Sequence, residues 1–197
     1  LKTVMLVKQI NPEAKVVLGG PHVHVFPEET INLSGIDFIV QGEGEHTFVK
    51  LLDNLNNPDA LENVKGLVFI KNNGTVVNTG ISPLIHNLDE LGFPARHLTD
   101  VTKYSSLLGK GNVITTMFTS RGCPYRCTFC DRPFSPVISG FRWRSASHVA
   151  DEMEECLNLG ISEGFIYDDT FTVRKDRVFE LCEEIKRRKI NFRWDVR

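Results

Sequence analysis

Short runs of β-branched and other apolar residues alternate in this chain with longer segments whose apolar residues follow a helical period. In the first half, helical patterns over 2–10, 27–33 and 45–55 flank apolar runs over 15–20 and 36–40. Such short apolar runs are typical of strands buried on both faces, and their alternation with helices predicts a parallel sheet. The fold class that we expect is therefore α/β, with a Rossmann-like sheet in this half.

The same alternation returns near the carboxyl end. Residues 113–119, 165–167 and 191–196 have the composition of strands, and 147–159 and 175–189 have the pattern of amphipathic helices. This order of strands and helices is that of the first part of a (β/α) barrel or of an open parallel sheet.

The pattern changes between these two halves. Two strand-like segments, 66–70 and 75–78, are joined by Asn72-Asn73-Gly74, a strong signal for a β-hairpin. The residues that follow are rich in Pro, Gly and Leu without a sustained period, as expected of a connecting segment. We therefore expect an α/β domain ending in a hairpin over 1–80, a linker over 81–112 and a second α/β domain over 113–197.

Charge and hydropathy give no support to two classes of partner, nucleic acids and membranes. The formal net charge is −2, so the chain lacks the basic excess that nucleic-acid binding requires. No apolar run is long enough to span a bilayer, and the amino end lacks the pattern of a secretory signal. The five cysteines do not resemble a disulfide framework, so we expect a cytoplasmic protein.

Three of these cysteines lie close together. Cys123, Cys127 and Cys130 form a CxxxCxxC pattern directly after the expected strand 113–119. A structural zinc site is one interpretation, although it would require a fourth ligand that the neighbouring sequence does not supply. Three thiolates also suit a four-iron, four-sulphur cluster, in which one iron stays open to a small ligand.

This loop resembles that of the radical S-adenosylmethionine (SAM) enzymes, in which CxxxCxxC follows the first strand of a partial barrel and an aromatic residue, here Phe129, precedes the last cysteine. The resemblance implies that Cys123, Cys127 and Cys130 hold a 4Fe-4S cluster whose open iron binds SAM. It also implies reductive cleavage of SAM, and a position of Phe129 against the adenine. A plain core aromatic is the alternative for Phe129.

The second strand of this half is followed by Asp168, Asp169 and Thr170. In the radical SAM family this position contacts the ammonium group of SAM, usually through a Gly-Gly-Glu type sequence that is not present here. The resemblance therefore implies that one or more of these three residues bind SAM. A helix N-cap is the alternative role for Asp169 or Thr170.

Two glycine-rich turns follow the strands of the first half, with Gly19 and Gly20 after one strand and Gly42, Glu43 and Gly44 after the next. Glycines at strand ends allow a ligand to approach the backbone. Together the two turns resemble the carboxyl-terminal half of the cobalamin-binding domain found in one radical SAM subfamily. The resemblance implies that these five residues line the site of the cobalamin nucleotide tail, and tight turns without a ligand are the alternative.

The resemblance covers residues 1 to about 60 and about 113 to 197, and it implies a function. The expected protein is a cobalamin-dependent radical SAM enzyme, similar to the anaerobic magnesium-protoporphyrin IX monomethyl ester cyclase and to the C- and P-methyltransferases. It would act on a small-molecule substrate, by methyl transfer or oxidative cyclisation, with electrons from flavodoxin or ferredoxin. A methylthiotransferase and a non-enzymatic electron-transfer module are the alternatives.

The chain begins at Leu1 without a methionine and ends directly after an expected strand. We therefore expect it to be a fragment of a longer protein. An unpaired edge at the strand 191–196 would favour self-association of such a fragment.

Overall fold

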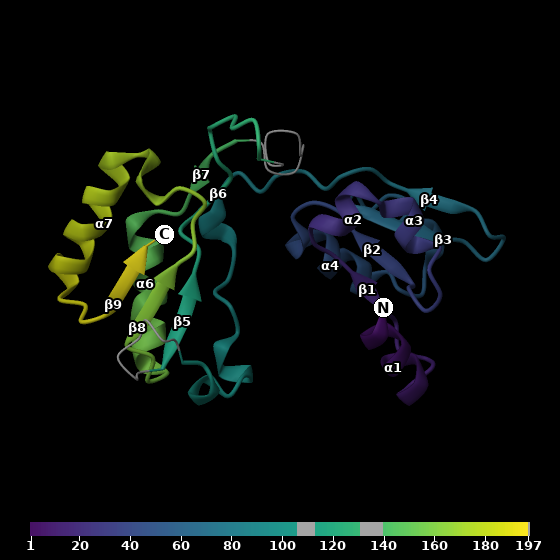
Figure 1. Ribbon diagram of the computed structural model, residues 1–197, viewed down its shortest axis with the longest axis horizontal. Helices are drawn as coiled ribbons and strands as arrows, with labels where there is room; N and C mark the ends of the chain where they lie inside the picture. Colours follow the sequence, from purple (N-terminus) through teal and green to yellow (C-terminus); the bar gives the residue numbers. More distant parts are fainter. Residues whose placement is uncertain (106–112, 131–139, 197) are drawn as a thin grey trace. The chain divides into compact units, whose positions relative to one another are not determined.

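In the computed structural model, which describes residues 1–105, 113–130 and 140–196, the chain divides into two units, residues 1–85 and 86–197 (Figure 1). The first unit thus extends to Ile85, slightly past the predicted end of the first domain. Among the described residues, no helix is long and apolar enough to cross a bilayer.

A four-stranded sheet forms the centre of the first unit, in the order β1 (Val17–Leu18), β2 (Phe38–Val40), β3 (Leu67–Ile70) and β4 (Val76–Asn78). Strands β1 and β2 are parallel, as predicted, whereas β3 and β4 form the predicted hairpin and extend the sheet in antiparallel fashion. The hairpin turn closes through a hydrogen bond of 2.9 Å from Lys71 N to Thr75 O, and Gly74 adopts a φ of 83°. The sheet is therefore mixed.

Helices cover both faces of this sheet. Successive strand residues point to opposite sides, so Phe38 and Val40 pack with α4 (Gly44–Asp53) and α5 (Pro58–Leu61), whereas Ile39 lies on the other face. That other face packs against α1 (Lys2–Ile10), α2 (Pro21–Val25) and α3 (Pro27–Ile31). Burial on both faces explains why these strands are apolar throughout.

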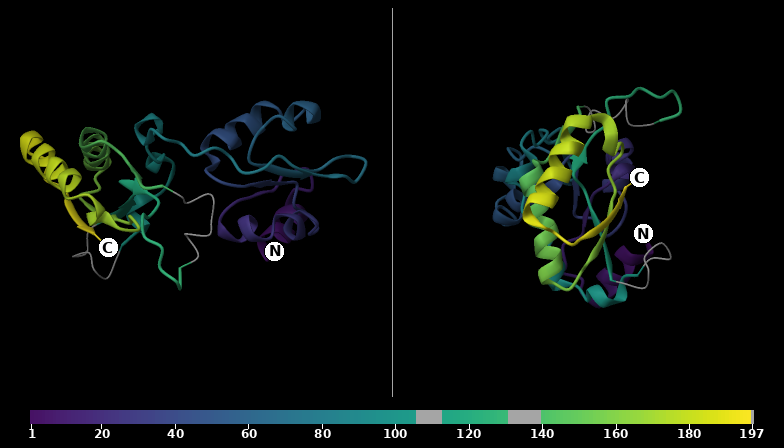
Figure 2. Two further views of the ribbon diagram at one scale, coloured as in Figure 1. Left: turned by 90° about the horizontal axis from the view of Figure 1, so that it is seen from above. Right: turned by 90° about the vertical axis from the view of Figure 1, so that its left-hand side faces the viewer.

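The second unit contains a parallel sheet in the order β5 (Ile114–Met117), β8 (Glu163–Ile166) and β9 (Arg193–Val196). Helices α6 (Ala146–Asn158) and α7 (Lys175–Arg188) connect the strands and lie side by side on one face (Figures 1 and 2). Met117 and Ile166 from the strands, Met153 and Cys156 from α6 and Leu181 from α7 form the core. This arrangement is the predicted βαβαβ unit.

The ends of these two helices follow from local sequence. The Ser145 hydroxyl accepts a hydrogen bond of 3.1 Å from the His148 amide and so caps the amino end of α6. Gly160, with a φ of 80°, follows the carboxyl end of α6, and Lys189 adopts the left-handed conformation after α7. The chain therefore leaves both helices sharply and returns to the sheet.

Residues 86–105, within the predicted linker, belong to the second unit. They contain three short 3₁₀ turns, η1 (Leu88–Glu90), η2 (Arg96–Leu98) and η3 (Val101–Lys103). Arg96 is buried and bonds the Thr115 hydroxyl and the Thr116 carbonyl of β5, each at 2.9 Å. This segment therefore packs along the free edge of β5. Of the rest of the predicted linker, residues 81–85 belong to the first unit and 106–112 lie outside the described residues.

Candidate cofactor site

The cysteine loop leaves the carboxyl end of β5 through the short strand β6 (Ser120–Arg121), which pairs in antiparallel fashion with β7 (Arg142–Trp143). This loop carries the thiols of Cys123, Cys127 and Cys130; Cys127 is exposed, and the other two are half-buried. The Cys130 amide donates a hydrogen bond of 3.1 Å to the Cys127 carbonyl, which forms a turn between these two cysteines.

The donor set of this loop fits the cluster that the sequence implies. Three thiols within eight residues, partly open to solvent, are a chemically suitable set of ligands for three irons. Within the ranges that the structure describes, no group of three His, Cys, Asp or Glu side chains is arranged to hold a single metal ion.

Asp168 lies directly beneath the start of this loop and is fully buried. One carboxylate oxygen accepts hydrogen bonds from the Thr119 and Ser120 amides at 2.6 and 3.0 Å, and the other accepts from both hydroxyls at 2.6 Å. Arg177 of α7 completes the set, with its Nη2 2.9 Å from the same carboxylate. The side chain of Asp168 therefore connects the ends of β5 and β8 to α7.

Burial lowers the pKa of the Arg177 guanidinium, and the neighbouring Asp168 charge opposes that effect. Arg177 also donates a hydrogen bond of 2.8 Å to the Phe171 carbonyl and stacks on the Phe171 ring. Three parts of this site were not predicted from the sequence: Arg177, Thr119 and Ser120. These residues lie around Asp168 only in the folded structure, so no pattern in the sequence identifies them.

Asp169 and Thr170 follow Asp168 at the same end of β8. Asp169 is exposed, and Thr170 is half-buried with its Oγ1 3.7 Å from the Cys123 sulphur. The structure thus brings Asp168 and Thr170 to the cysteine loop. The contact of any of these three residues with SAM stays a prediction. The Asp168 carboxylate already accepts five hydrogen bonds from the protein, and a contact with SAM would add to these.

Phe129 has 91% of its side-chain surface exposed at the edge of the cysteine loop. Phe129 is therefore not a core aromatic residue, which was the alternative raised from the sequence. The proposed contact of Phe129 with adenine stays a prediction.

Behind the loop, a buried ionic cluster joins three segments of the second unit. Glu152 of α6 has 1% of its surface exposed and pairs with Arg96 at 2.6 Å and with Arg144. Arg144 also donates to the Phe118 carbonyl at 2.9 Å, next to the end of β5. The cluster therefore fixes residues 86–105 and the β7 strand to α6.

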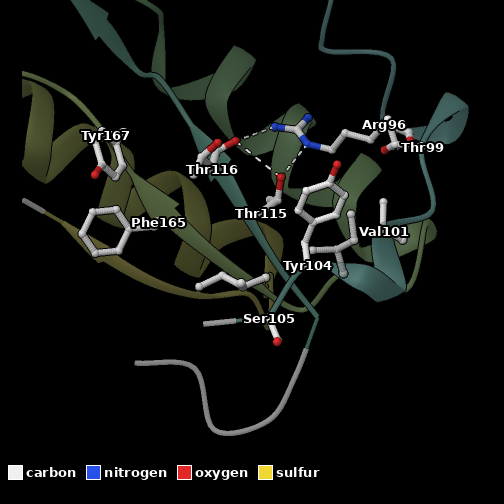
Figure 3. A pocket seen from close by; sticks show the side chains of 11 residues that line it. Arg96, Thr99, Val101, Tyr104, Ser105, Thr115, Thr116, Phe165 and Tyr167 are labelled. Atoms are coloured by element: carbon white, nitrogen blue, oxygen red, sulfur yellow. Dashed lines mark hydrogen bonds between the residues drawn. The ribbon is translucent and has the colours of Figure 1, made fainter. Parts of the chain in front are cut away.

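A cavity of about 460 Å³ lies beside β5 and β8 (Figure 3). Phe165 and Tyr167, which alternate with the core residue Ile166, contribute aromatic rings to it, and Tyr104 and Thr116 contribute hydroxyl groups. Figure 3 shows the Arg96 guanidinium at its rim, bonded to Thr115 and Thr116.

The glycine-rich turns of the first unit differ in their surroundings. Gly20 has a φ of 98°, and a Cβ there would meet no atom within 4 Å, so its surface is open. Gly19 would meet only ordinary contact with the Val40 carbonyl, at 3.7 Å. These two residues are free to receive a ligand against the backbone.

The second turn is covered by its own chain. At Gly42, with a φ of 93°, a Cβ would clash with the Ser82 hydroxyl. Glu43 accepts a hydrogen bond of 2.6 Å from the Ile85 amide through its side chain and one of 3.0 Å from Ser82 through its carbonyl. At Gly44 a Cβ would approach Val40 Cγ1 to 3.3 Å. Residues 81–85 therefore pack against Gly42 and Glu43, and Val40 packs against Gly44. The contact of these three residues with cobalamin stays a prediction.

The two units correspond to two known domain families. Residues 1–52 match the B12 binding domain, and residues 117–196 match the Radical SAM superfamily. The chain therefore combines a B12 binding domain with a Radical SAM domain, which confirms the resemblance drawn from the cysteine and glycine patterns.

Two curated relatives are similar to this chain over both domains. The chain is 38% identical over 195 residues to an uncharacterised methyltransferase of Pyrococcus horikoshii, covering 96% of this chain and 40% of that protein. It is 28% identical over 200 residues to the anaerobic magnesium-protoporphyrin IX monomethyl ester cyclase of Rubrivivax gelatinosus, covering 99% of this chain and 35% of that one. The chain thus spans well under half the length of these relatives.

Solved structures share the fold. The cobalamin-dependent SAM radical enzyme OxsB, solved with aqua-cobalamin and SAM bound, superposes with a TM-score of 0.75 at 20% identity, over 97% of this chain and 27% of that chain. The radical SAM methyltransferase TsrM from Kitasatospora setae, solved with cobalamin and a [4Fe-4S] cluster bound, gives a TM-score of 0.67 at 23% identity, over 95% and 37%.

Proposed function

We propose that this protein is a cobalamin-dependent radical SAM enzyme that modifies a small-molecule substrate. The observation that carries the proposal is the set of three cysteine thiols, Cys123, Cys127 and Cys130, on one loop after β5 within the radical SAM domain. When bound there, a 4Fe-4S cluster supplies the electron that cleaves SAM to methionine and a 5'-deoxyadenosyl radical.

The protein's own residues have defined tasks in this proposal. The cysteines hold three irons and leave one open for SAM, while Asp168 and Arg177 fix the base of the loop. Phe129 borders the adenine, and Asp169 or Thr170 receives the ammonium group at the end of β8. Gly19 and Gly20 form the open backbone surface for the cobalamin tail, with Gly42, Glu43 and Gly44 beside it.

Methyl transfer is the reaction that we favour over oxidative cyclisation, because the relative at 38% identity is named as a methyltransferase and the cyclases are less similar. The B12 domain match over 1–52 supports cobalamin dependence over the methylthiotransferase alternative. Electrons would come from flavodoxin or ferredoxin in a cytoplasmic setting, and a fragment ending at β9 would self-associate through the edge of that strand.

The cluster is tested by anaerobic loading with iron and sulphide. We expect about four irons and four sulphides per chain, with broad visible absorbance. Cys127→Ala should abolish uptake, whereas Cys182→Ala, a half-buried thiol on α7, should leave it unchanged. Adding SAM to the reduced protein should change its electron paramagnetic resonance spectrum. Tight zinc at full occupancy in place of iron, or a spectrum that ignores SAM, would contradict the proposal.

Cobalamin binding is tested with a matched pair of glycines. Gly20 and Gly74 both have positive φ and open space at the Cβ position, so alanine should impose similar backbone strain at each. Gly20→Ala should weaken hydroxocobalamin binding because its methyl group occupies the ligand surface, whereas Gly74→Ala should not. Equal affinities in the two variants would remove Gly20 from the site.

A further inference from the structure

The hydroxyl group of Thr170 lies next to a cysteine of the loop. Thr170 Oγ1 is 3.7 Å from Cys123 Sγ, within the range of a hydrogen bond to sulphur, although the two residues are 47 positions apart in sequence. This contact joins the segment after β8 to the first of the three thiols.

Anchors on both sides hold Thr170 in place. Before it, Asp168 is fixed by five hydrogen bonds, two of which come from the amides of Thr119 and Ser120 at the root of the cysteine loop. After it, Phe171 is buried with 3% of its surface exposed, and its carbonyl accepts a hydrogen bond of 2.8 Å from Arg177. The Thr170 hydroxyl therefore faces Cys123 as a consequence of the surrounding packing.

The chemistry of the two groups sets the direction of the hydrogen bond. A cysteine that ligates iron is a thiolate and can only accept, whereas the threonine hydroxyl can donate. A hydrogen bond to a cluster sulphur favours the more negative, reduced state, and such bonds are among the factors that set cluster potentials.

We propose that the Thr170 hydroxyl donates a hydrogen bond to the Cys123 thiolate and raises the reduction potential of the cluster that this loop holds. The inference rests on the proposed function, because it requires a cluster on Cys123. Thr170 is thus a positioning residue for electron uptake, in addition to any contact with SAM.

The test is a redox titration of the loaded protein with dithionite, followed by electron paramagnetic resonance, in the absence of SAM. Thr170→Val keeps the shape of the side chain and removes the donor, so its cluster should titrate at a more negative potential than that of the wild type. Thr170→Ser keeps the donor and should stay close to the wild type. Thr172→Val, an exposed hydroxyl in the same segment, is the matched control and should show no shift.

The outcomes separate this inference from the proposed function. A wild-type protein that takes up no iron and sulphide overturns both, whereas a normal cluster with equal potentials in the wild type and Thr170→Val overturns the inference alone. If Thr170→Val fails to hold a cluster, the hydrogen bond is tested by electron–nuclear double resonance of the wild type and Thr170→Ala in H₂O and D₂O. We expect an exchangeable proton coupled to the cluster that is lost in Thr170→Ala, and identical proton spectra would reject the hydrogen bond.

Discussion

Cys156 and Cys127 have opposite environments. Cys156 is fully buried on α6, and burial raises the pKa of its thiol to about 11, whereas Cys127 is exposed. Because only the thiolate reacts, about one Cys156 in a thousand is reactive near pH 8. We predict that iodoacetamide labels Cys127 of the cluster-free native protein and leaves Cys156 unlabelled, as read by peptide mass spectrometry.

Denaturant provides the control for this labelling experiment. Once the chain is unfolded, Cys156 should react at the rate of an ordinary thiol. Equal labelling of Cys156 and Cys127 in the native state would mean that α6 does not stay packed as the structure describes.

His148 makes the stability of the second unit depend on pH. Burial lowers the pKa of His148 below 6.5, and the nearby Arg144 charge lowers it further, while Asp89 acts in the opposite sense. The unfolded chain therefore binds more protons than the folded chain as the pH falls through 6.5. The stability linked to neutral His148 is present above that value and is lost below it.

We predict that thermal unfolding shifts to a lower temperature between about pH 7.5 and about pH 5.5. The shift should be smaller in His148→Gln, because the variant cannot take up this proton, and groups common to both proteins cancel in the comparison. A variant with a pH dependence as steep as that of the wild type would show that other groups carry the effect.

The residue types of the site were predictable, but their partners were not. The spacing of the three cysteines alone predicts a cluster, because all three lie on one loop. Asp168 was recognised only as an acidic group at a strand end. Its partners Thr119 and Ser120 are 49 and 48 residues away, so its buried position and its internal hydrogen bonds depend on the packing of β5 against β8.

At the scale of elements, Gly66 marks the point where β2, β3 and residues 81–85 meet. It has a φ of 94°, and a Cβ would lie 2.8 Å from Thr47 Oγ1, 2.9 Å from Ser82 Cβ and 3.0 Å from the Gln41 carbonyl. Gly74 in the hairpin turn has a φ of 83° with open space around it. The two positions share backbone strain and differ in crowding.

We predict that Gly66→Ala lowers the free energy of unfolding of the first unit by about 3 kcal/mol, from strain and overpacking together. Gly74→Ala should cost about 1 kcal/mol, from strain alone. Urea unfolding of both variants measures the difference. If the two variants lose equal stability, the close approach around Gly66 is not present in solution.

Elements with a clear period were predictable, and those without one were not. The helix 2–10 and the hairpin around Asn72-Asn73-Gly74 were confirmed because period and turn chemistry act locally. Strands β6 and β7 are two residues each, too short to show alternation, and they form because Arg144 and its neighbours fix the return of the chain. Residues 86–105 show no sustained period because their only helical elements are short 3₁₀ turns, and contacts with α6 and β5 hold the segment in place.

At the scale of the whole molecule, residues 86–105 define where the second unit begins. Arg96 and Arg144 share the buried carboxylate of Glu152, and removal of one partner from a buried ionic cluster typically costs about 3–5 kcal/mol. A domain boundary set at residue 113 would remove Arg96 and open the edge of β5.

We predict that a chain starting at His86 unfolds cooperatively and that a chain starting at Val113 does not. Circular dichroism during thermal unfolding distinguishes them, and Arg96→Ala in the longer chain should account for part of the loss. A cooperative transition of the shorter chain at the same temperature would place the boundary after this segment.

The hydrogen bonds of Asp168 also order the steps by which the protein matures. Its bonds to Thr119 and Ser120 close a loop of almost fifty residues, so they require the ends of β5 and β8 to lie side by side. A nascent chain emerging from the ribosome presents its three cysteines well before it presents Asp168. The root of the cysteine loop is therefore shaped after synthesis of β8, and iron delivered earlier would meet thiols on an unfolded segment.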